Sequence, residues 1–527
     1  MEVNKLHNAL TAWTDALGSN SIELQGSQDT NSNMLPSSVQ LKPVSIEEIQ
    51  TCLAIANEFG VSVYPLSTGL NWGYGSRNPA SSESVVVDLS KLNQIVDYDN
   101  TLGIVTLEPG VSQTQLNSFL QQQGGDFWMD VTGSSPNCSV LGNSLERGFG
   151  HSPYSDHAAH LLELEVILAN GNCIRTSMGQ FAPTQSNTQY AAGIGPGLLP
   201  LFLQSNLGLI TKATIQLMPR PEYFQAMYFS IGKNNQLANL IDVLRPLRLN
   251  GTIQSALHLG NGYRVLSSIQ QYPWEAMNGS TPLSPEVLAQ FGRQWDFGAW
   301  NGAAGLYGTR KQVAETKRIM KSALKGHVKR IRFMDDSQLE FAKILKTPYK
   351  WLTGLNLPEL LKIIEPVHGM MKGIPSDRVI ASTYWRKRMS IPGSMDPDRD
   401  GCGLIWCAHL APTKGVCAQE MADLVADKVQ SHGFEPGMTI TMINERTLDN
   451  VISISYDKDI QGEHERAMKC YHELANALIR KGHYPYRLGV QAMNLLSEYR
   501  HPSYQATLES IKHALDPNHI LSPGRYI

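Results

Sequence analysis

A run of small residues after the first short strand pattern has the composition of a phosphate-binding loop. It follows the apolar stretch at 61–64 and reads Pro65-Leu66-Ser67-Thr68-Gly69-Leu70-Asn71-Trp72-Gly73-Tyr74-Gly75. Glycine has no Cβ and tolerates positive φ, so backbone N–H groups in such a loop can approach a phosphate closely. The spacing fits neither the P-loop nor the Gly-x-Gly-x-x-Gly fingerprint. The loop predicts a diphosphate cradle and leaves the ligand open.

Two further stretches are dominated by small residues. They lie at 133–150 and 204–211, and the second leads into a strand at 213–218. Few of their side chains can fill a core, so their backbone is expected to run along something bulky. Each stretch alone is as readily a surface turn. Three such stretches in order favour a long, thin ligand.

The composition excludes several classes of protein. The chain has 527 residues, of which 42% are hydrophobic, enough for two or more packed domains. Its net charge of −3 gives no general attraction to nucleic acid or to an anionic membrane. The seven cysteines are scattered and never form C-x-x-C, so neither a disulfide framework nor a thiolate zinc site is indicated.

The same sequence indicates a cytoplasmic protein. Residues 1–18 carry acidic and polar side chains throughout and are typical of an amphipathic helix rather than a signal peptide. No apolar run approaches the roughly 20 residues that a membrane span needs. We therefore expect neither a membrane nor a nucleic-acid partner.

Elements of two α+β domains can be placed around the glycine-rich stretches. The first region alternates helix and strand patterns, with helices at 45–56 and from 113 and with strands at 61–64, 85–89, 104–107 and 162–168. The second shows strands at 223–231, 404–410, 439–442 and 451–456, and helices at 233–245, 309–324, 417–432 and 462–481. Residues 484–527 are too loop-like for a free tail. We predict a first domain at 1–221 with a C-terminal return at 485–527, and a second domain at 222–484.

Together these motifs resemble the two-domain flavoproteins of the vanillyl-alcohol oxidase and p-cresol methylhydroxylase family. The resemblance spans nearly the whole chain and rests on segments at 65–75, 108–110, 139–150, 153–157, 204–211 and 516–524. It implies an α+β FAD-binding fold with the diphosphate on the 65–75 loop and the ring system against a cap domain. The residues it assigns to the cofactor are Pro65, Ser67, Thr68, Gly69, Leu70, Asn71, Gly73, Tyr74, Gly75, Gly133, Ser134, Ser139, Gly142, Asn143, Arg147, Gly148, Gly150, Tyr154, Gly208, Ile210 and Arg525.

Three side chains match the family positions that hold a phenol as its phenolate. They are Tyr74, Tyr486 and Arg487. Two phenolic donors and a guanidinium with a pKa above about 12 favour the ionised substrate by hydrogen bonding and opposite charge. The phenolate pushes electrons to the para carbon, so a hydride can leave the benzylic carbon toward the flavin N5 and give a quinone methide. Taken singly, a buried tyrosine is more often a core residue.

Two positions depart from the family pattern. Ser134 stands where vanillyl-alcohol oxidase has an aspartate near the flavin, and a hydroxyl cannot serve as a base near neutral pH. His151 stands where that enzyme has a further tyrosine. An imidazole can act as an acid or base at neutral pH, or it can simply shape the pocket wall as a neutral ring. Both residues remain candidates for the catalytic site.

Covalent flavin attachment is not indicated. Leu404 falls where vanillyl-alcohol oxidase carries its flavin-linked histidine, and leucine cannot form that bond. Cys407, His409 and Tyr384 lie close enough in sequence to be alternative nucleophiles, although each also reads as a core residue. The cluster Asp156-His157-x-x-His160 has metal-ligand residue types, but it lies inside a flavin-lining motif and no third strong ligand follows. We expect no metal.

The resemblance and the residues together predict FAD-dependent oxidation of a para-substituted phenol, of the 4-alkylphenol or 4-hydroxybenzylic alcohol type. One alternative is oxidation of a non-phenolic alcohol in a biosynthetic pathway, with His151 as base. Another is a flavin-binding electron-transfer subunit without substrate turnover. Gly133 leaves space that suits oxygen as the acceptor, whereas relatives of the p-cresol type pass electrons to a cytochrome. A homodimer or larger assembly is common in the family.

Overall fold

The first sheet delivers the chain into the glycine-rich loop at 65–75. The computed structural model describes residues 2–24, 36–181, 183–344 and 357–527. In spatial order the strands are β1 (Ile22–Leu24), β2 (Val39–Leu41), β4 (Ser84–Asp88) and β3 (Ser62–Leu66). β3 runs parallel to β4 and ends where the loop begins. Helices α1 (Glu2–Leu17) and α2 (Ile46–Phe59) pack on each other beside this sheet.

Local sequence explains α2. Its N-cap is Ser45, whose hydroxyl accepts the backbone N–H of Glu48, and it ends at Gly60 in the left-handed conformation. Its apolar stripe includes Ile49 and Leu53, which are fully buried together with Val63 of β3. This core fixes where β3 releases the chain into the loop.

A second sheet supports the other two small-residue stretches. It is antiparallel, and its strands in order are β5 (Ile95–Asp99), β6 (Ile104–Leu107), β10 (Leu209–Gln216), β8 (Leu161–Ile167) and β9 (Cys173–Arg175). A small pair, β7 (Phe127–Trp128) and β11 (Met218–Pro219), lies nearby, as do α3 (Gln113–Gln122) and α4 (Val140–Leu145). The turn at 169–172 joins β8 to β9, and the two strands form an antiparallel hairpin.

A third sheet has seven strands and forms a separate lobe, which we call the cap lobe. All its neighbouring strands are antiparallel. In spatial order they are β15 (Arg330–Met334), β12 (Tyr223–Ile231), β14 (Trp300–Gly308), β13 (Leu257–Asn261), β17 (Gly437–Met442), β18 (Thr447–Asp457) and β16 (Cys402–Pro412).

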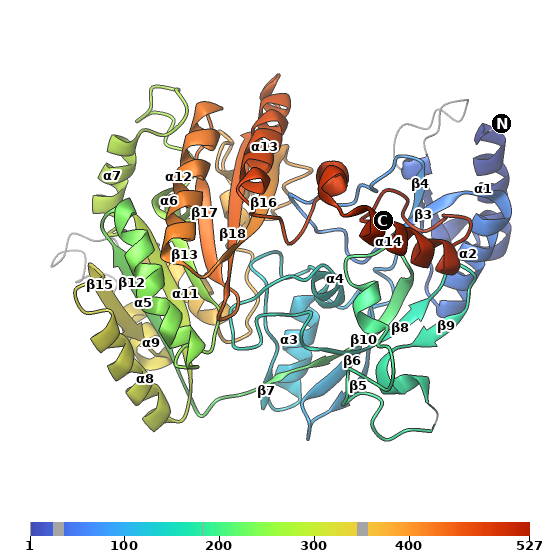
Figure 1. Ribbon diagram of the computed structural model, residues 1–527, viewed down its shortest axis with the longest axis horizontal. Coiled ribbons are helices and arrows are strands. Elements are labelled where there is room, and N and C mark those ends of the chain that lie inside the picture. The colour runs from blue at the N-terminus through green and yellow to red at the C-terminus, as the bar shows by residue number, and fades with distance from the viewer. Residues whose placement is uncertain (1, 25–35, 182, 345–356) are drawn as a thin grey trace.

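Helices cover the two faces of this sheet unequally. One face packs against α5 (Leu237–Leu249), α8 (Arg310–Ala323), α12 (Gly415–Ser431) and α13 (Glu463–Arg480), which stand in front of the sheet in Figure 1. On the other face α6 (Gly262–Ile269) crosses β13, β14 and β17, with α7 (Pro285–Gln294), α9 (Asp336–Ile344) and α11 (Leu357–Met370) beside it. The strands therefore keep part of one face open toward the first lobe.

Short 3₁₀ helices complete the connections. They are η1 (Ser19–Ser21), η2 (Pro36–Ser38), η3 (Ser177–Gln180), η4 (Leu199–Phe202), η5 (Asn234–Gln236), η6 (Ile380–Tyr384) and η7 (Val490–Tyr499). Among the described residues, no helix has the length and apolar character to cross a membrane.

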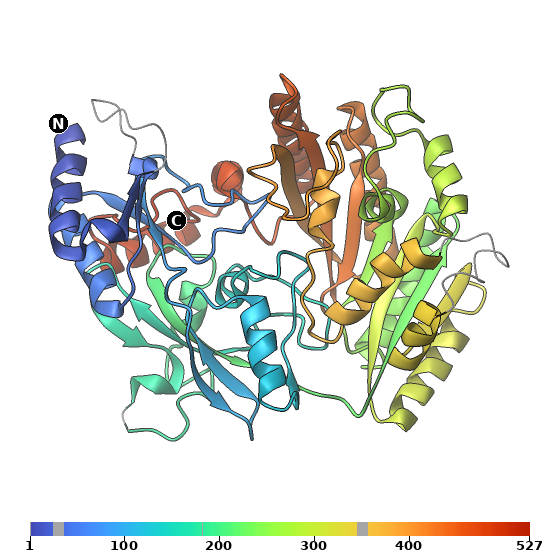
Figure 2. The same cartoon turned by 180° about the vertical axis from the view of Figure 1, so that it is seen from behind.

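The end of the chain returns to the first lobe. After η7 and α14 (Pro502–Leu515), Leu521 forms a parallel bridge with Val63 of β3. The Ser522 N–H donates to the Val63 carbonyl at 2.8 Å. Figures 1 and 2 show this red segment beside the blue N-terminal strands, with the cap lobe on the other side of the molecule. This α+β arrangement supports the division at 221/222 and 484/485, which we keep as a proposal.

Candidate functional site

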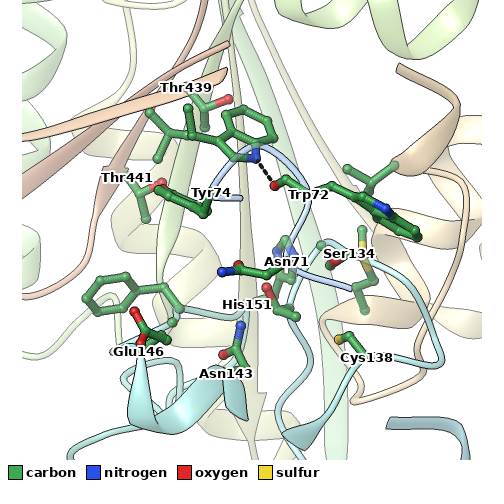
Figure 3. Close-up of a pocket in the computed structure, with 18 of the residues that line it drawn as sticks. Asn71, Trp72, Tyr74, Ser134, Cys138, Asn143, Glu146, His151, Thr439 and Thr441 are labelled. Carbon is green, nitrogen blue, oxygen red and sulfur yellow. Dashed lines mark hydrogen bonds between the residues drawn. The ribbon is translucent and has the colours of Figure 1, made fainter. Parts of the chain in front are cut away.

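A cavity of about 750 Å³ lies where the two lobes meet. Loops of the first lobe form one wall, and the open face of the cap sheet forms another. In β17, Thr439 and Thr441 face the cavity, whereas the alternate residue Ile440 is buried in the core under the helices. Figure 3 shows Thr439 and Thr441 across from Asn143 and Glu146 of the first lobe.

The loop after β3 has the properties of a phosphate cradle. Within the described residues, the backbone N–H groups of 67–71 donate no hydrogen bond. The loop is closed by the N–H groups of Tyr74 and Ser76, which both donate to the Asn71 carbonyl at 3.1 Å. Gly69 has φ +71°, a conformation that glycine adopts without strain. Consecutive free N–H groups on a fixed loop fit a diphosphate.

The second small-residue stretch lies directly against this loop. The Ser139 N–H donates to the Thr68 hydroxyl at 3.1 Å. A Cβ placed on Gly142 would lie 2.4 Å from the Ser67 hydroxyl oxygen, so the close approach of the two segments requires glycine there. The sequence prediction that these stretches line one ligand is therefore consistent with their positions.

Most of the residues that we assigned to the cofactor border the cavity. They are Pro65, Ser67, Thr68, Gly69, Leu70, Asn71, Tyr74, Gly133, Ser134, Ser139, Gly142, Asn143, Gly148, Gly208, Ile210 and Arg525. Five others stand outside its wall, namely Gly73, Gly75, Arg147, Gly150 and Tyr154. Gly73 instead permits packing of the Trp406 indole, because a Cβ there would lie 2.4 Å from the ring.

The three predicted phenolate-binding residues lie together on the cavity wall. The Arg487 guanidinium carbon is 4.2 Å from the centre of the Tyr74 ring, and the Tyr74 and Tyr486 side chains are close enough to influence each other's pKa. Burial raises the pKa of both tyrosines, so both hydroxyls remain donors at neutral pH. The ring of Phe149 packs against Tyr486 at 5.4 Å.

This wall carries an excess positive charge. Glu146 forms ion pairs with both Arg487, at 3.4 Å, and Arg525. Burial tends to raise the pKa of Glu146, but the two guanidinium groups outweigh it and hold the pKa low. Arg487 also donates to the Asn71 side-chain oxygen at 2.7 Å. Two guanidinium groups sharing one carboxylate leave one positive charge available to an anion.

Asp449 is a site residue that the sequence reasoning missed. It lies on β18 beside Thr441 of β17, borders the cavity and is 2% exposed. Within the part of the chain that the structure describes, its Oδ1 atom has no hydrogen-bond partner, and burial raises the pKa of the carboxyl group to about 8. A negative charge on Asp449 would raise the pKa of both Tyr74 and Tyr486. A carboxyl group at this place is neutral at pH 7. The strand predicted at 451–456 begins after Asp449, and β18 mixes polar with apolar residues, so no motif in the sequence marked this carboxyl group.

His151 and Ser134 both border the cavity, from the first lobe. The His151 ring is 4.6 Å from the His258 ring of β13, and its Nδ1 atom is buried with no hydrogen-bond partner among the described residues. Burial lowers the pKa of His151, so the ring is neutral at pH 7. His258 interacts with the Thr441 hydroxyl at 3.0 Å, and burial lowers its pKa to about 3.

Arg264 of α6 also borders the cavity and was not predicted. Its Nη1 atom donates to the Ser382 hydroxyl at 3.2 Å, and its guanidinium carbon lies 5.5 Å from the centre of the Trp406 ring. Burial lowers its pKa to about 10, with no acidic neighbour acting on it. At this pKa the guanidinium keeps its charge at neutral pH.

The three alternative flavin nucleophiles lie away from the cavity wall. On β16 it is Leu404 and Trp406 that border the cavity, while Cys407 is buried in the core and close to His409, 3.4 Å away. Tyr384 is fully buried, and its hydroxyl donates to Asp400 at 2.5 Å. These positions support non-covalent attachment.

The cluster that raised the question of a metal has other partners. His157 contacts Asp130 at 2.7 Å and Asn143 at 2.6 Å, and His160 contacts the Asp156 carbonyl at 2.8 Å. Over the described ranges, no group of three or more His, Cys, Asp or Glu side chains is arranged to hold a metal ion.

Comparison with known proteins gives the family. Residues 37–177 match the FAD binding domain, and residues 448–526 match the C-terminal domain of FAD linked oxidases. The 1'-carboxy-chondrochloren decarboxylase of Chondromyces crocatus is 37% identical to this chain, over 100% of the chain and 98% of that protein. The chain belongs to the FAD-linked oxidase family.

Other relatives place this FAD-linked oxidase near the phenol-oxidising members. The 4-cresol dehydrogenase [hydroxylating] flavoprotein subunit of Pseudomonas putida is 28% identical over 93% of this chain and 87% of its own. The crystal structure of p-cresol methylhydroxylase with substrate bound superposes with a TM-score of 0.87, at 26% identity, over 99% of this chain and 97% of that one. The 4-ethylphenol oxidase of Gulosibacter chungangensis shares the fold, with a TM-score of 0.88 at 24% identity and the same coverage.

FAD is the cofactor of this oxidoreductase, and the cavity fits it. The free N–H groups of 67–71 suit its diphosphate. When bound, FAD supplies the acceptor for a hydride.

Proposed function

We propose that this FAD-linked oxidase oxidises a para-substituted phenol, of the 4-alkylphenol or 4-hydroxybenzylic alcohol type, through a quinone methide. One observation carries the proposal: Tyr74, Tyr486 and Arg487 converge on one part of the cavity wall. Similarity to p-cresol methylhydroxylase and to 4-cresol dehydrogenase supports the substrate class.

In this proposal the three side chains hold the phenol oxygen as an anion. The tyrosine hydroxyls donate hydrogen bonds to it, and Arg487 supplies positive charge in a site with little water. Charge on the oxygen raises electron density at the para position, which weakens the benzylic C–H bond toward loss of hydride. Asp449, neutral at pH 7, adds no negative charge that would oppose the phenolate.

Anaerobic reduction of the flavin tests this proposal. We expect 4-propylphenol to bleach the flavin absorbance of the wild-type holoenzyme, and 4-propylanisole, whose oxygen cannot ionise, to leave it unchanged. Tyr486→Phe is expected to slow bleaching by about 10- to 1000-fold, because it removes one donor to the oxyanion. Equal bleaching by the phenol and the anisole would refute the phenolate mechanism.

The same experiment separates the two alternatives. Oxidation of a non-phenolic alcohol predicts bleaching by a benzylic alcohol without a hydroxyl group on the ring, and loss of this bleaching in His151→Asn. An electron-transfer subunit predicts no bleaching by either class and reduction only through a partner protein. His151 supports the first alternative through its neutral ring and its unpartnered Nδ1 atom beside the cavity.

A second candidate function is oxidation coupled to loss of a carboxyl group. The Chondromyces crocatus relative is named as a decarboxylase, and Arg264 provides a cation beside the cavity. For a phenolate bearing CH₂–CHR–COO⁻ at the para position, hydride would leave the benzylic carbon to give the quinone methide. Cleavage of the bond to the carboxylate would then release CO₂, and its electron pair would form the side-chain double bond and restore the phenolate. The assay is the appearance of the vinylphenol absorbance together with CO₂.

Further aspects of the proposal concern the acceptor and the setting. We propose oxygen as the acceptor because Gly133, which has no side chain, leaves space for it beside Ser134. A redox protein such as a cytochrome is the alternative. All seven cysteines are free, which supports a reducing, cytoplasmic location. We propose a homodimer or larger assembly, to be checked by light scattering of the holoenzyme.

A further inference from the structure

Arg264 differs from the other arginines that border the cavity. Five arginines of the described chain do so, and four of them form an ion pair. Arg487 and Arg525 pair with Glu146, while Arg330 and Arg332 pair with Asp296. Within the described residues, no carboxylate pairs with Arg264, whose side chain donates a single hydrogen bond, to the Ser382 hydroxyl.

The position of Arg264 is fixed although its charge is unpaired. Asn261 caps the first turn of α6 by accepting the Arg264 N–H at 3.0 Å. The guanidinium is held at one end by Ser382 and lies over the ring of Trp406. Among the described residues, its Nε and Nη2 atoms have no hydrogen-bond partner, and Arg264 keeps accessible surface where it borders the cavity. These two atoms form the planar fork that binds a carboxylate with two parallel hydrogen bonds.

Arg264 is connected to the proposed phenolate site through one side chain. The Trp406 indole packs where a Cβ on Gly73 would lie, and Gly73 immediately precedes Tyr74. Trp406 also donates its ring N–H to the Trp72 carbonyl at 3.1 Å, the hydrogen bond drawn in Figure 3. Trp406 therefore contacts Arg264 and also the loop that carries Tyr74, on whose ring Arg487 packs.

We propose that Arg264 binds a carboxylate on the para side chain of the substrate, so that the substrates are phenols with an acidic side chain. This inference rests on the proposed phenol oxidation and names the substrate class of the same cavity. A partly buried guanidinium without a counter-ion costs free energy in the empty site, and a bound carboxylate offsets that cost. A dianionic substrate then meets one cation at each end.

Two phenols of the same carbon skeleton test the inference. We expect the wild-type holoenzyme to oxidise 3-(4-hydroxyphenyl)propanoate with a kcat/KM well above that for 4-propylphenol. Arg264→Gln is expected to lower kcat/KM for the propanoate by about 10- to 100-fold and to change that for 4-propylphenol by less than about twofold. Arg264→Lys keeps the charge without the fork, so its kcat/KM for the propanoate is expected to lie between those of wild type and Arg264→Gln. Arg318→Gln on the exposed face of α8 serves as the control for removal of one arginine.

A binding measurement keeps this inference separate from the proposed reaction. The probe is 3-(4-methoxyphenyl)propanoate, which has the carboxylate but no ionisable phenol, titrated against the flavin absorbance of the holoenzyme. We expect weaker binding in Arg264→Gln by about 10- to 100-fold. If neither phenol reduces the flavin, the proposed reaction is wrong, while Arg264-dependent binding still supports the carboxylate site. The carboxylate site would be overturned by equal binding of the probe to wild type and Arg264→Gln. It would also be overturned if Arg264→Gln lowered kcat/KM equally for both phenols.

Discussion

Replacement of Asp449 by asparagine should stabilise the protein at neutral pH, by an amount that depends on pH. Asp449 is 2% exposed, its Oδ1 atom has no hydrogen-bond partner in the described ranges of the chain, and burial raises its pKa to about 8. In the unfolded chain an aspartate has a pKa near 3.9. Between these values the folded protein holds a proton at Asp449 that the unfolded chain has lost.

The sign and size of the effect follow from this difference in bound protons. The group has its raised pKa in the folded state, so unfolding releases a proton and is favoured as pH rises. The free energy of unfolding of wild type therefore falls relative to Asp449→Asn by about 1.4 kcal/mol per pH unit between about pH 4 and pH 8. From about pH 5 to pH 7.5, the advantage of the variant should grow by about 3 kcal/mol.

Urea unfolding of both proteins at the two pH values measures this growth. The other titrating groups are common to both proteins, so their contributions cancel in the comparison. An infrared band of a protonated carboxylic acid, present in wild type and absent in the variant, provides a second readout at neutral pH. A stability difference that does not change with pH, together with no such band, would show that Asp449 is ionised in the folded protein and refute the reasoning.

Three further substitutions test other parts of the site. Gly73→Ala places a Cβ 2.4 Å from the Trp406 ring at a residue with φ +79°. We therefore expect the free energy of unfolding to fall by about 1–3 kcal/mol and FAD to be released faster, which flavin fluorescence measures. Unchanged FAD retention would contradict this. In Gly133→Ala the new Cβ lies 3.6 Å or more from its nearest neighbours, so thermal stability should stay the same. Reoxidation of the reduced flavin by oxygen should become slower. An unchanged reoxidation rate in stopped-flow measurements would argue against an oxygen path at this position. Glu146→Gln leaves two buried guanidinium groups without their carboxylate. We expect the free energy of unfolding, measured by thermal unfolding, to fall by about 3–5 kcal/mol and to be partly recovered in Glu146→Asp. Wild-type stability in Glu146→Gln would count against the charge cluster.

Elements with strong local patterns could be predicted from the sequence. The strand expected at 223–231 coincides with β12, and the helix expected at 309–324 differs from α8 by one residue at each end. Thr309 accepts the Gln312 N–H and fixes the start of that helix. Such signals are local in sequence, so they do not depend on which parts of the chain meet.

Strand β14 was missed for a physical reason. Its sequence is rich in glycine and alanine, which is not typical of a strand. Gly302 pairs with Phe229 of β12, and a Cβ on Gly302 would lie 2.2 Å from that ring. The neighbouring aromatic side chain fills the place of the missing one, and this compensation is visible only when the two strands are paired.

The site itself was predicted where motifs are contiguous and missed where single residues meet. The glycine loop and the Tyr486-Arg487 pair could be found because their sequence context is long. Asp449 and Arg264 are isolated residues of β18 and α6, and only the tertiary structure brings them to the cavity. The alternation along β16 correctly places Cys407 and His409 on one face, but the sequence does not say which face borders the cavity.

The pairing of Leu521 with Val63 has a consequence for how the protein is made. The wall that contains Arg525 forms only when the last part of the sequence reaches the first sheet, after the whole cap lobe has left the ribosome. A nascent chain can fold its early strands, but it cannot yet enclose the cofactor. We therefore expect FAD to be captured after synthesis rather than during it, and chains that stall before this segment to be released as colourless apoprotein.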